Sequence, residues 1–184
     1  MCIRDSIGPG GAGGYAEYQN NSGFGGGAGG ATQITQKLTS GESFPVTVSE
    51  SNSSFGSLVS ATAGKSGGKW DEAPGTGGTG SGGTNYQGGS GKSKSSESQT
   101  QGTDGGCYTS EQAAVMAALS ETGGKGGNQE DGKIPCTVSK AGFAPFGCGG
   151  GGGGYQYAGS AGGWAGKRDG GEGFGGAVIV EFVL

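Results

Sequence analysis

The chain has 184 residues, 50 of them glycine, and a formal net charge of −4. Glycine makes up about 27% of the chain against roughly 7% in ordinary proteins, while Leu, Ile, Val and Phe reach only about 13%, below the ~20% that a conventional apolar core needs. Histidine, the most common general base and metal ligand, is absent. The composition therefore argues against an enzyme and indicates a binding or structural protein with no catalytic residue, metal or cofactor.

The first six residues, Met1-Cys2-Ile3-Arg4-Asp5-Ser6, can be back-translated into a sequence that resembles the adapter of transposase-made sequencing libraries. Such segments are excluded from fold reasoning. We therefore expect residues 1–6 to be a library scar and residues 7–184 to form a single glycine-rich domain.

Three cysteines remain after that exclusion, namely Cys107, Cys136 and Cys148. Without histidine they are too few for a tetrahedral zinc site. Two alternatives stay open: a Cys136–Cys148 disulfide, or thiols that act as small buried apolar groups.

The clearest strand pattern follows the glycine block at 8–30. Ile34, Gln36 and Leu38 alternate with their neighbours, and Phe44, Val46 and Val48 follow after Ser40-Gly41. This pattern predicts a β-hairpin. Residues 53–59 predict a further short strand, and residues 177–184 predict a closing strand of the buried type.

Residues 64–106 form a Gly/Ser/Thr tract that, taken alone, cannot bury enough surface to offset its ordering entropy. We expect this tract to be loop-like or disordered. After it, Thr109 to Gln112 fit a capping box, which predicts one short helix over 109–120 that ends near Gly123.

Glycine blocks between strands can also be ordered. Glycine segments can run as extended, left-handed threefold helices that pack closely enough for neighbouring backbones to bond each other. Such a bundle needs strands to anchor its ends, because glycine loses much entropy on ordering. We therefore expect a mostly-β fold, a sandwich of strands and polyglycine II-like segments with one short helix and little conventional core.

Several pieces of the chain resemble the glycine-rich domain of bacteriophage and prophage tail fibres and tail-tip adhesins, and they occur in that family's order. They are residues 10–17, 38–48, 53–56, 61–64, 149–154 and 175–180. Two departures are the polar stretch 49–52 after the second strand and the helix at 109–120, which looks like an insertion.

The resemblance implies a compact sandwich of β-strands and polyglycine helices whose loops contact a host receptor. The partners would be a glycan or protein on the bacterial surface and an upstream fibre shaft, which could be homotrimeric. The location would be the tip of a virion tail fibre or the extracellular space.

Aromatic residues in Gly/Ser/Thr surroundings are the candidate ligand-binding residues, because flat rings with polar ends suit recognition surfaces. They are Trp70, Tyr86, Tyr108, Tyr155, Tyr157 and Trp164. The alternative is that these rings are packing plugs between glycine segments, an alternative that is stronger for Tyr15, Phe55 and Phe174.

Other functions find less support in the sequence. Gly75 to Gly80 match G-x-G-x-x-G, but such matches arise by chance at this glycine content and no strand precedes this one. The acidic pI of about 4.8 disfavours nucleic acid, and no apolar run is long enough for membrane insertion. A secreted glycine-rich structural protein of a matrix or cell wall remains the alternative function.

Overall fold

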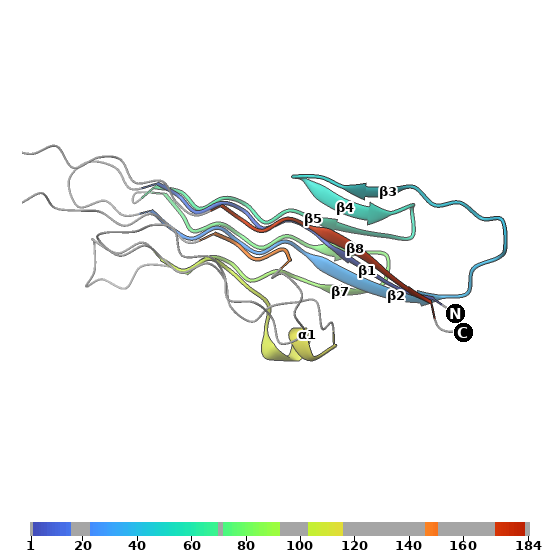
Figure 1. Ribbon diagram of the computed structural model, residues 1–184. Helices are drawn as coiled ribbons and strands as arrows, with labels where there is room; N and C mark the ends of the chain where they lie inside the picture. The colour runs from blue at the N-terminus through green and yellow to red at the C-terminus, as the bar shows by residue number, and fades with distance from the viewer. Residues whose placement is uncertain are drawn as a thin grey trace, which may run out of the picture.

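Two β-sheets lie at one end of an elongated molecule, and extended glycine-rich segments run side by side away from them (Figure 1). The structure, a computed structural model, describes residues 2–15, 23–69, 72–92, 103–115, 146–150 and 172–182. Each sheet has four antiparallel strands, so the prediction of a mostly-β protein is confirmed.

The first sheet has the strand order β7-β2-β1-β8. Its strands are β1 (Cys2–Ile7), β2 (Ala31–Gln36), β7 (Thr84–Tyr86) and β8 (Ala177–Phe182). The closing strand is thus confirmed over residues 177–182. Its side chains from Ala177 to Val180 are half-buried and not fully buried, because β8 lies at the edge of the sheet.

Strand β1 consists almost entirely of the residues that we expected to be a scar. It pairs along its whole length with β2 and β8, with Cys2 opposite both Gln36 and Phe182. Residues 2–6, which the sequence analysis set aside as a scar, therefore contribute to the first sheet. Ladder bonds use backbone groups that every non-proline residue carries, so the DNA origin of a segment does not prevent it from pairing; the scar interpretation itself stays a prediction.

The second sheet has the order β3-β4-β5-β6. Its strands are β3 (Val46–Val48), β4 (Asn52–Phe55), β5 (Val59–Thr62) and β6 (Gly80–Ser81). The strand predicted at 53–59 is two strands, because the chain turns at Gly56, where φ is +55°, and β5 returns antiparallel to β4.

The hairpin predicted from residues 34–48 is wrong. A turn does occur at Ser40 and Gly41, where the Glu42 amide donates to the Thr39 carbonyl over 3.3 Å. The chain then crosses to the other sheet, so β2 pairs with β1 and β7 while β3 pairs with β4. Alternation predicted the first strand but could not specify its partner.

Small side chains fill the region between the sheets. Val59 and Ala61 of β5 are buried, as are the polar residues Ser6, Thr32 and Ser53. Phe55 is 7% exposed and stacks on Phe44, with ring centroids 5.1 Å apart. The packing alternative is therefore confirmed for Phe55.

Beyond the sheets, neighbouring segments bond each other at every third residue. The amides of Gly8, Gly11 and Gly14 donate to the carbonyls of Gly30, Gly27 and Phe24, each over 2.8 Å. The same three residues of 23–30 donate in turn to Thr62, Lys65 and Gly68, which themselves donate to Thr79, Thr76 and Ala73, all over 2.9 Å. Successive segments are thus joined in register, level by level.

Residues 23–30, the central segment, lie at the middle of this arrangement, and all eight are buried. Hydrogen bonds link the central segment to six surrounding segments: 8–15, 63–69, 73–79, 87–92, 103–107 and 147–150. We call these seven segments, together with 173–176, the glycine bundle.

The backbone of the central segment has its polar groups paired. Every amide from Phe24 to Gly30 donates to an acceptor, which is a backbone carbonyl except at Gly25, where it is the Thr103 hydroxyl. Every carbonyl from Gly23 to Gly30 accepts from a backbone amide except that of Gly29, which accepts from the Tyr108 hydroxyl. Burial of bare backbone is tolerated here because its hydrogen bonds are made.

Much of the tract at 64–106 belongs to the glycine bundle. Residues 63–69, 73–79 and 87–92 carry regularly spaced bonds, and β6 and β7 lie in the same tract. The described residues of the tract therefore find hydrogen-bond partners in other segments, and the expectation of a loop-like or disordered stretch stays a prediction. An argument from the tract alone leaves out the hydrogen-bond partners that its backbone has elsewhere in the chain.

The helix begins as predicted. Helix α1 spans Ser110–Val115, the Thr109 amide donates to Gln112 Oε1 over 2.8 Å, and the Gln112 amide donates to Thr109 Oγ1 over 3.3 Å. This reciprocal pair is a capping box. The rest of the predicted helix, to residue 120, and its end near Gly123 lie outside the described residues.

Candidate functional site

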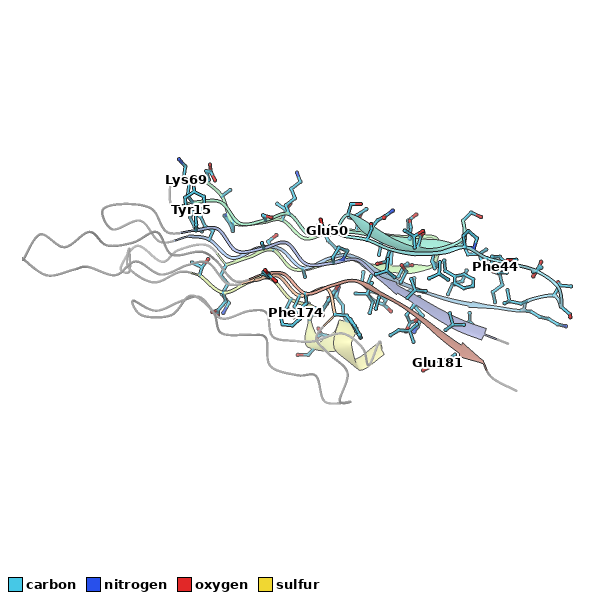
Figure 2. All side chains as sticks on the ribbon, turned by 45° about the horizontal axis from the view of Figure 1, so that its top comes forward. Tyr15, Phe44, Glu50, Lys69, Phe174 and Glu181 are labelled. Atoms are coloured by element: carbon cyan, nitrogen blue, oxygen red, sulfur yellow. The ribbon has the colours of Figure 1, made fainter. Side chains whose placement is uncertain are left out.

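Different parts of the chain lie at the two ends of the molecule. Cys2 and Phe182 are paired at the sheet end. The opposite end of the bundle, where the described residues Tyr15 and Lys69 lie (Figure 2), we call the far end. Figure 2 shows Tyr15 and Lys69 at the far end, well away from Phe44 and Glu181.

Polar side chains fix the described residues of the far end. Lys92 Nζ lies 2.8 Å from Asp104 Oδ2, which joins segments 87–92 and 103–107. Glu72 Oε2 accepts from the Lys69 amide over 3.0 Å, and the Glu72 amide donates back to the Lys69 carbonyl over 2.9 Å. These contacts join residues that border positions 70–71 and 93–102 in the sequence.

Four of the six candidate ligand-binding residues, Trp70, Tyr155, Tyr157 and Trp164, lie outside the described residues. Their flanking residues are described, however. Trp70 comes between Lys69 and Glu72, and the other three come between Gly150 and Glu172. Of these flanking residues, Lys69 lies at the far end (Figure 2) and Gly150 bonds to Gly11 and Gly26.

Tyr86 and Tyr108 lie toward the sheets. Tyr86 is half-buried on β7, opposite Ala31, and packs against a core cluster that includes Ile7 and Ala28. Neither tyrosine is brought together with the flanks of the other four candidates.

Tyr108 is 4% exposed and belongs to that core cluster. Its hydroxyl donates to the Gly29 carbonyl over 2.8 Å. Burial, with smaller contributions from the neighbouring Cys148 and Cys107, raises the pKa of Tyr108 well above its ordinary value. The expectation that Tyr108 is presented for recognition is therefore wrong, because the ring packs in the core and the hydroxyl completes the backbone bonding of the central segment.

A sequence signal for this burial was available. Tyr108 directly precedes Thr109, the N-cap of α1. Apolar residues at that position commonly pack inward as half of a hydrophobic staple. The glycine-rich context drew attention to exposure, whereas the capping box pointed to packing.

The G-x-G-x-x-G match at residues 75–80 is part of the bundle and of β6. Gly75 is buried and donates to the Gly25 carbonyl, a Cβ on Gly77 would meet the Gly88 carbonyl, and Gly80 lies in β6 opposite Ala61. A dinucleotide site needs these glycines at the start of a helix facing a ligand. Here they lie against other parts of the chain.

Two kinds of site are missing from the part of the chain that the structure describes. Within the described ranges no cluster of three or more His, Cys, Asp or Glu side chains could hold a metal ion. Among the same residues, no helix has the length and apolar character that crossing a membrane requires.

Comparisons with known proteins found no match. No family model matches the sequence, and neither a curated protein nor a solved structure matches it. The functional argument therefore depends on this chain's own residues.

Proposed function

We propose that the chain is a receptor-recognition module of a bacteriophage or prophage tail fibre or adhesin. One observation carries the proposal. Strands β1 and β8 are paired at the sheet end, and the described segments of the glycine bundle run from the sheets toward the opposite end, where Tyr15 and Lys69 lie (Figures 1 and 2). An elongated module of this kind can be attached at one end and make contact at the other, which suits a link to a fibre shaft and contact with a cell surface.

The described part of the bundle supplies the rigid support that such a role requires. Binding residues are commonly carried on loops whose ends a rigid scaffold holds. The described segments are joined by the level-by-level backbone bonds and by the contacts of Lys92 and Glu72. Several copies on one particle would then combine weak single sites into firm attachment.

We also propose that the bundle segments are polyglycine II helices. A threefold helix turns the backbone through a full circle in three residues, which matches bonds at every third residue and neighbours on all sides of residues 23–30. A crystal structure tests this proposal. We expect φ and ψ of the central segment near about −75° and +145°; values near about −140° and +135°, those of antiparallel strands, would contradict it.

The receptor proposal is tested by binding of the fluorescently labelled chain to a panel of bacterial strains. We expect binding to some strains and at least about a tenfold weaker binding for Trp70→Ala and Trp164→Ala, the size expected for aromatic anchors of an interface. Thr47→Ala is the matched control, because Thr47 is exposed on β3 at the sheet end. Absence of binding to every strain, while an established phage adhesin binds under the same conditions, would overturn the proposal.

A further inference from the structure

Two cysteines that are 41 residues apart in the sequence meet in the glycine bundle. Cys107 closes segment 103–107, and Cys148 lies in segment 147–150. Their sulfur atoms are 2.6 Å apart. Since bonded sulfur atoms are separated by about 2.05 Å, only a small side-chain adjustment separates this pair from a covalent bond.

The backbone, and not a chance side-chain rotamer, brings the pair together. The Gly149 amide donates to the Gly106 carbonyl over 3.0 Å, which joins the immediate neighbours of the two cysteines. The Cys107 carbonyl accepts from Gly89 and the Cys148 carbonyl accepts from Phe174, both over 2.9 Å. Each cysteine is therefore fixed to a further segment of the bundle.

The two thiols differ in access. Cys148 is 0% exposed, whereas Cys107 is half-buried. A reagent from solution reaches Cys107 first, with Cys148 behind it at contact distance. That is the arrangement of an attacking thiol and a resolving thiol.

We propose that Cys107 and Cys148 are a redox site that forms a disulfide when the protein meets a small-molecule disulfide such as oxidised glutathione. The Cys107 thiolate attacks one sulfur of the oxidant, forming a mixed disulfide and releasing one glutathione thiolate. The Cys148 thiolate then attacks Cys107 Sγ, forming the Cys107–Cys148 bond and releasing the second glutathione thiolate. The protein loses two protons and two electrons, and one oxidised glutathione becomes two reduced molecules.

The bond would join two of the six segments that surround residues 23–30. It would also close the chain between residues 107 and 148 into a covalent loop whose first residue, Tyr108, is buried against the central segment. This pairing differs from the Cys136–Cys148 alternative left open by the sequence. It rests on the bundle geometry alone and does not depend on the receptor-recognition proposal.

Peptide mapping of the full chain tests the proposal directly. The folded protein is incubated with oxidised glutathione, alkylated, digested and analysed by mass spectrometry. We expect a linked peptide pair containing Cys107 and Cys148 that disappears after reduction. The double variant Cys2→Ser/Cys136→Ser, which keeps only this pair, should still lose the mass of two hydrogen atoms on oxidation.

Two further variants separate the roles of the cysteines. Cys148→Ser should stop the reaction at the glutathione adduct on Cys107, whereas Cys107→Ser should give neither the adduct nor the bond under the same exposure. Circular dichroism of each variant checks that the sheets are retained. Mapping of the unmutated chain decides the matter should a variant not fold: a peptide that links Cys136 to either cysteine, or complete alkylation of Cys107 and Cys148 after oxidation, would overturn the proposal.

Discussion

The hydroxyl of Tyr108 donates a hydrogen bond of 2.8 Å to the carbonyl of Gly29, 79 residues earlier in the chain. The seven other carbonyls of the central segment accept from backbone amides. A side chain from outside the segment therefore supplies the last donor that this buried backbone needs.

Removing that hydroxyl should destabilise the fold. Tyr108→Phe keeps the ring but leaves the buried Gly29 carbonyl without its donor, a change that costs about 1–3 kcal/mol. Urea unfolding followed by circular dichroism measures the loss. Tyr86→Phe is the matched control, because Tyr86 is half-buried on β7 and should change the free energy of unfolding by less than about 0.5 kcal/mol. Equal losses of unfolding free energy in the two variants would show that the hydrogen bond to Gly29 does not stabilise the fold more than an ordinary surface contact.

Thr103 has the corresponding role for an amide. Its hydroxyl accepts from the Gly25 amide over 2.9 Å, so Thr103→Ala should cost about 1–2 kcal/mol. Thr103→Ser retains the hydroxyl and should recover most of that loss. Hydrogen exchange at Gly25, compared between the two variants by NMR, distinguishes this local cause: the amide should exchange faster in Thr103→Ala, and unchanged exchange would contradict the assignment.

Two glycines should differ sharply in their tolerance of a methyl group. A Cβ on Gly26 would overlap the carbonyls of Gly11 and Ala12, whereas a Cβ on Gly175 would meet no atom within 4 Å. We expect Gly26→Ala to cost more than about 3 kcal/mol, above the usual range for overpacking because backbone must move. Gly175→Ala should be neutral or stabilising by up to about 1 kcal/mol. Thermal unfolding of both variants gives the comparison, and a tolerated Gly26→Ala would count against close packing of the central segment.

The Phe44–Phe55 pair should behave as a coupled unit. Phe55→Ala removes a buried ring and should cost about 3–5 kcal/mol. A double-mutant cycle with Phe44→Ala should give a coupling energy of about 0.5–1.5 kcal/mol from the stacked rings. Strictly additive losses would mean that the two rings contribute independently. Denaturant unfolding of the four proteins in the cycle provides all the required values.

Stability should fall as the pH rises above the ordinary range of an aspartate. Burial, with a smaller contribution from Glu181, raises the pKa of Asp5 above 3.8, opposed by the hydrogen bond from Gln33. Between the unfolded and folded pKa values, the folded chain binds more protons, so the free energy of unfolding decreases with increasing pH. Asp5→Asn should remove this slope and stabilise the protein at neutral pH. Glu50→Gln, on an exposed residue, is the control that should leave the slope in place.

Local patterns in the sequence predicted elements better than they predicted partners. Alternation at residues 34–38 indicated a strand, and Thr109 to Gln112 indicated a helix start; both signals depend on neighbouring residues. The neighbours of β2 are β1 and β7, from residues 2–7 and 84–86, and no local pattern encodes such pairings. The sites were harder still, because a tyrosine in glycine-rich sequence suits a surface and a core equally, and only the position of Tyr108 before an N-cap distinguished the two.

Composition is also limited in predicting whether a glycine-rich segment is ordered. Low apolar content indicated that residues 64–106 could not order themselves, and that argument counts side chains only. In the bundle the backbone supplies both the contacts and the hydrogen bonds, so glycine content is compatible with order once enough neighbours are present. Glycine-rich sequence therefore predicts either outcome, and the anchoring strands indicate which one applies.

The position of residues 23–30 at the middle of six segments also has a kinetic consequence. Their bonding partners extend from Gly8 to Gly150, so the segment has its full set of bonds only after most of the chain has been brought together. Folding that depends on such distant contacts is slow, and we expect this strip of backbone to be enclosed late. The amides of Gly26 to Gly29 should consequently exchange with solvent only when the whole bundle opens, which makes their exchange rate a direct gauge of global unfolding.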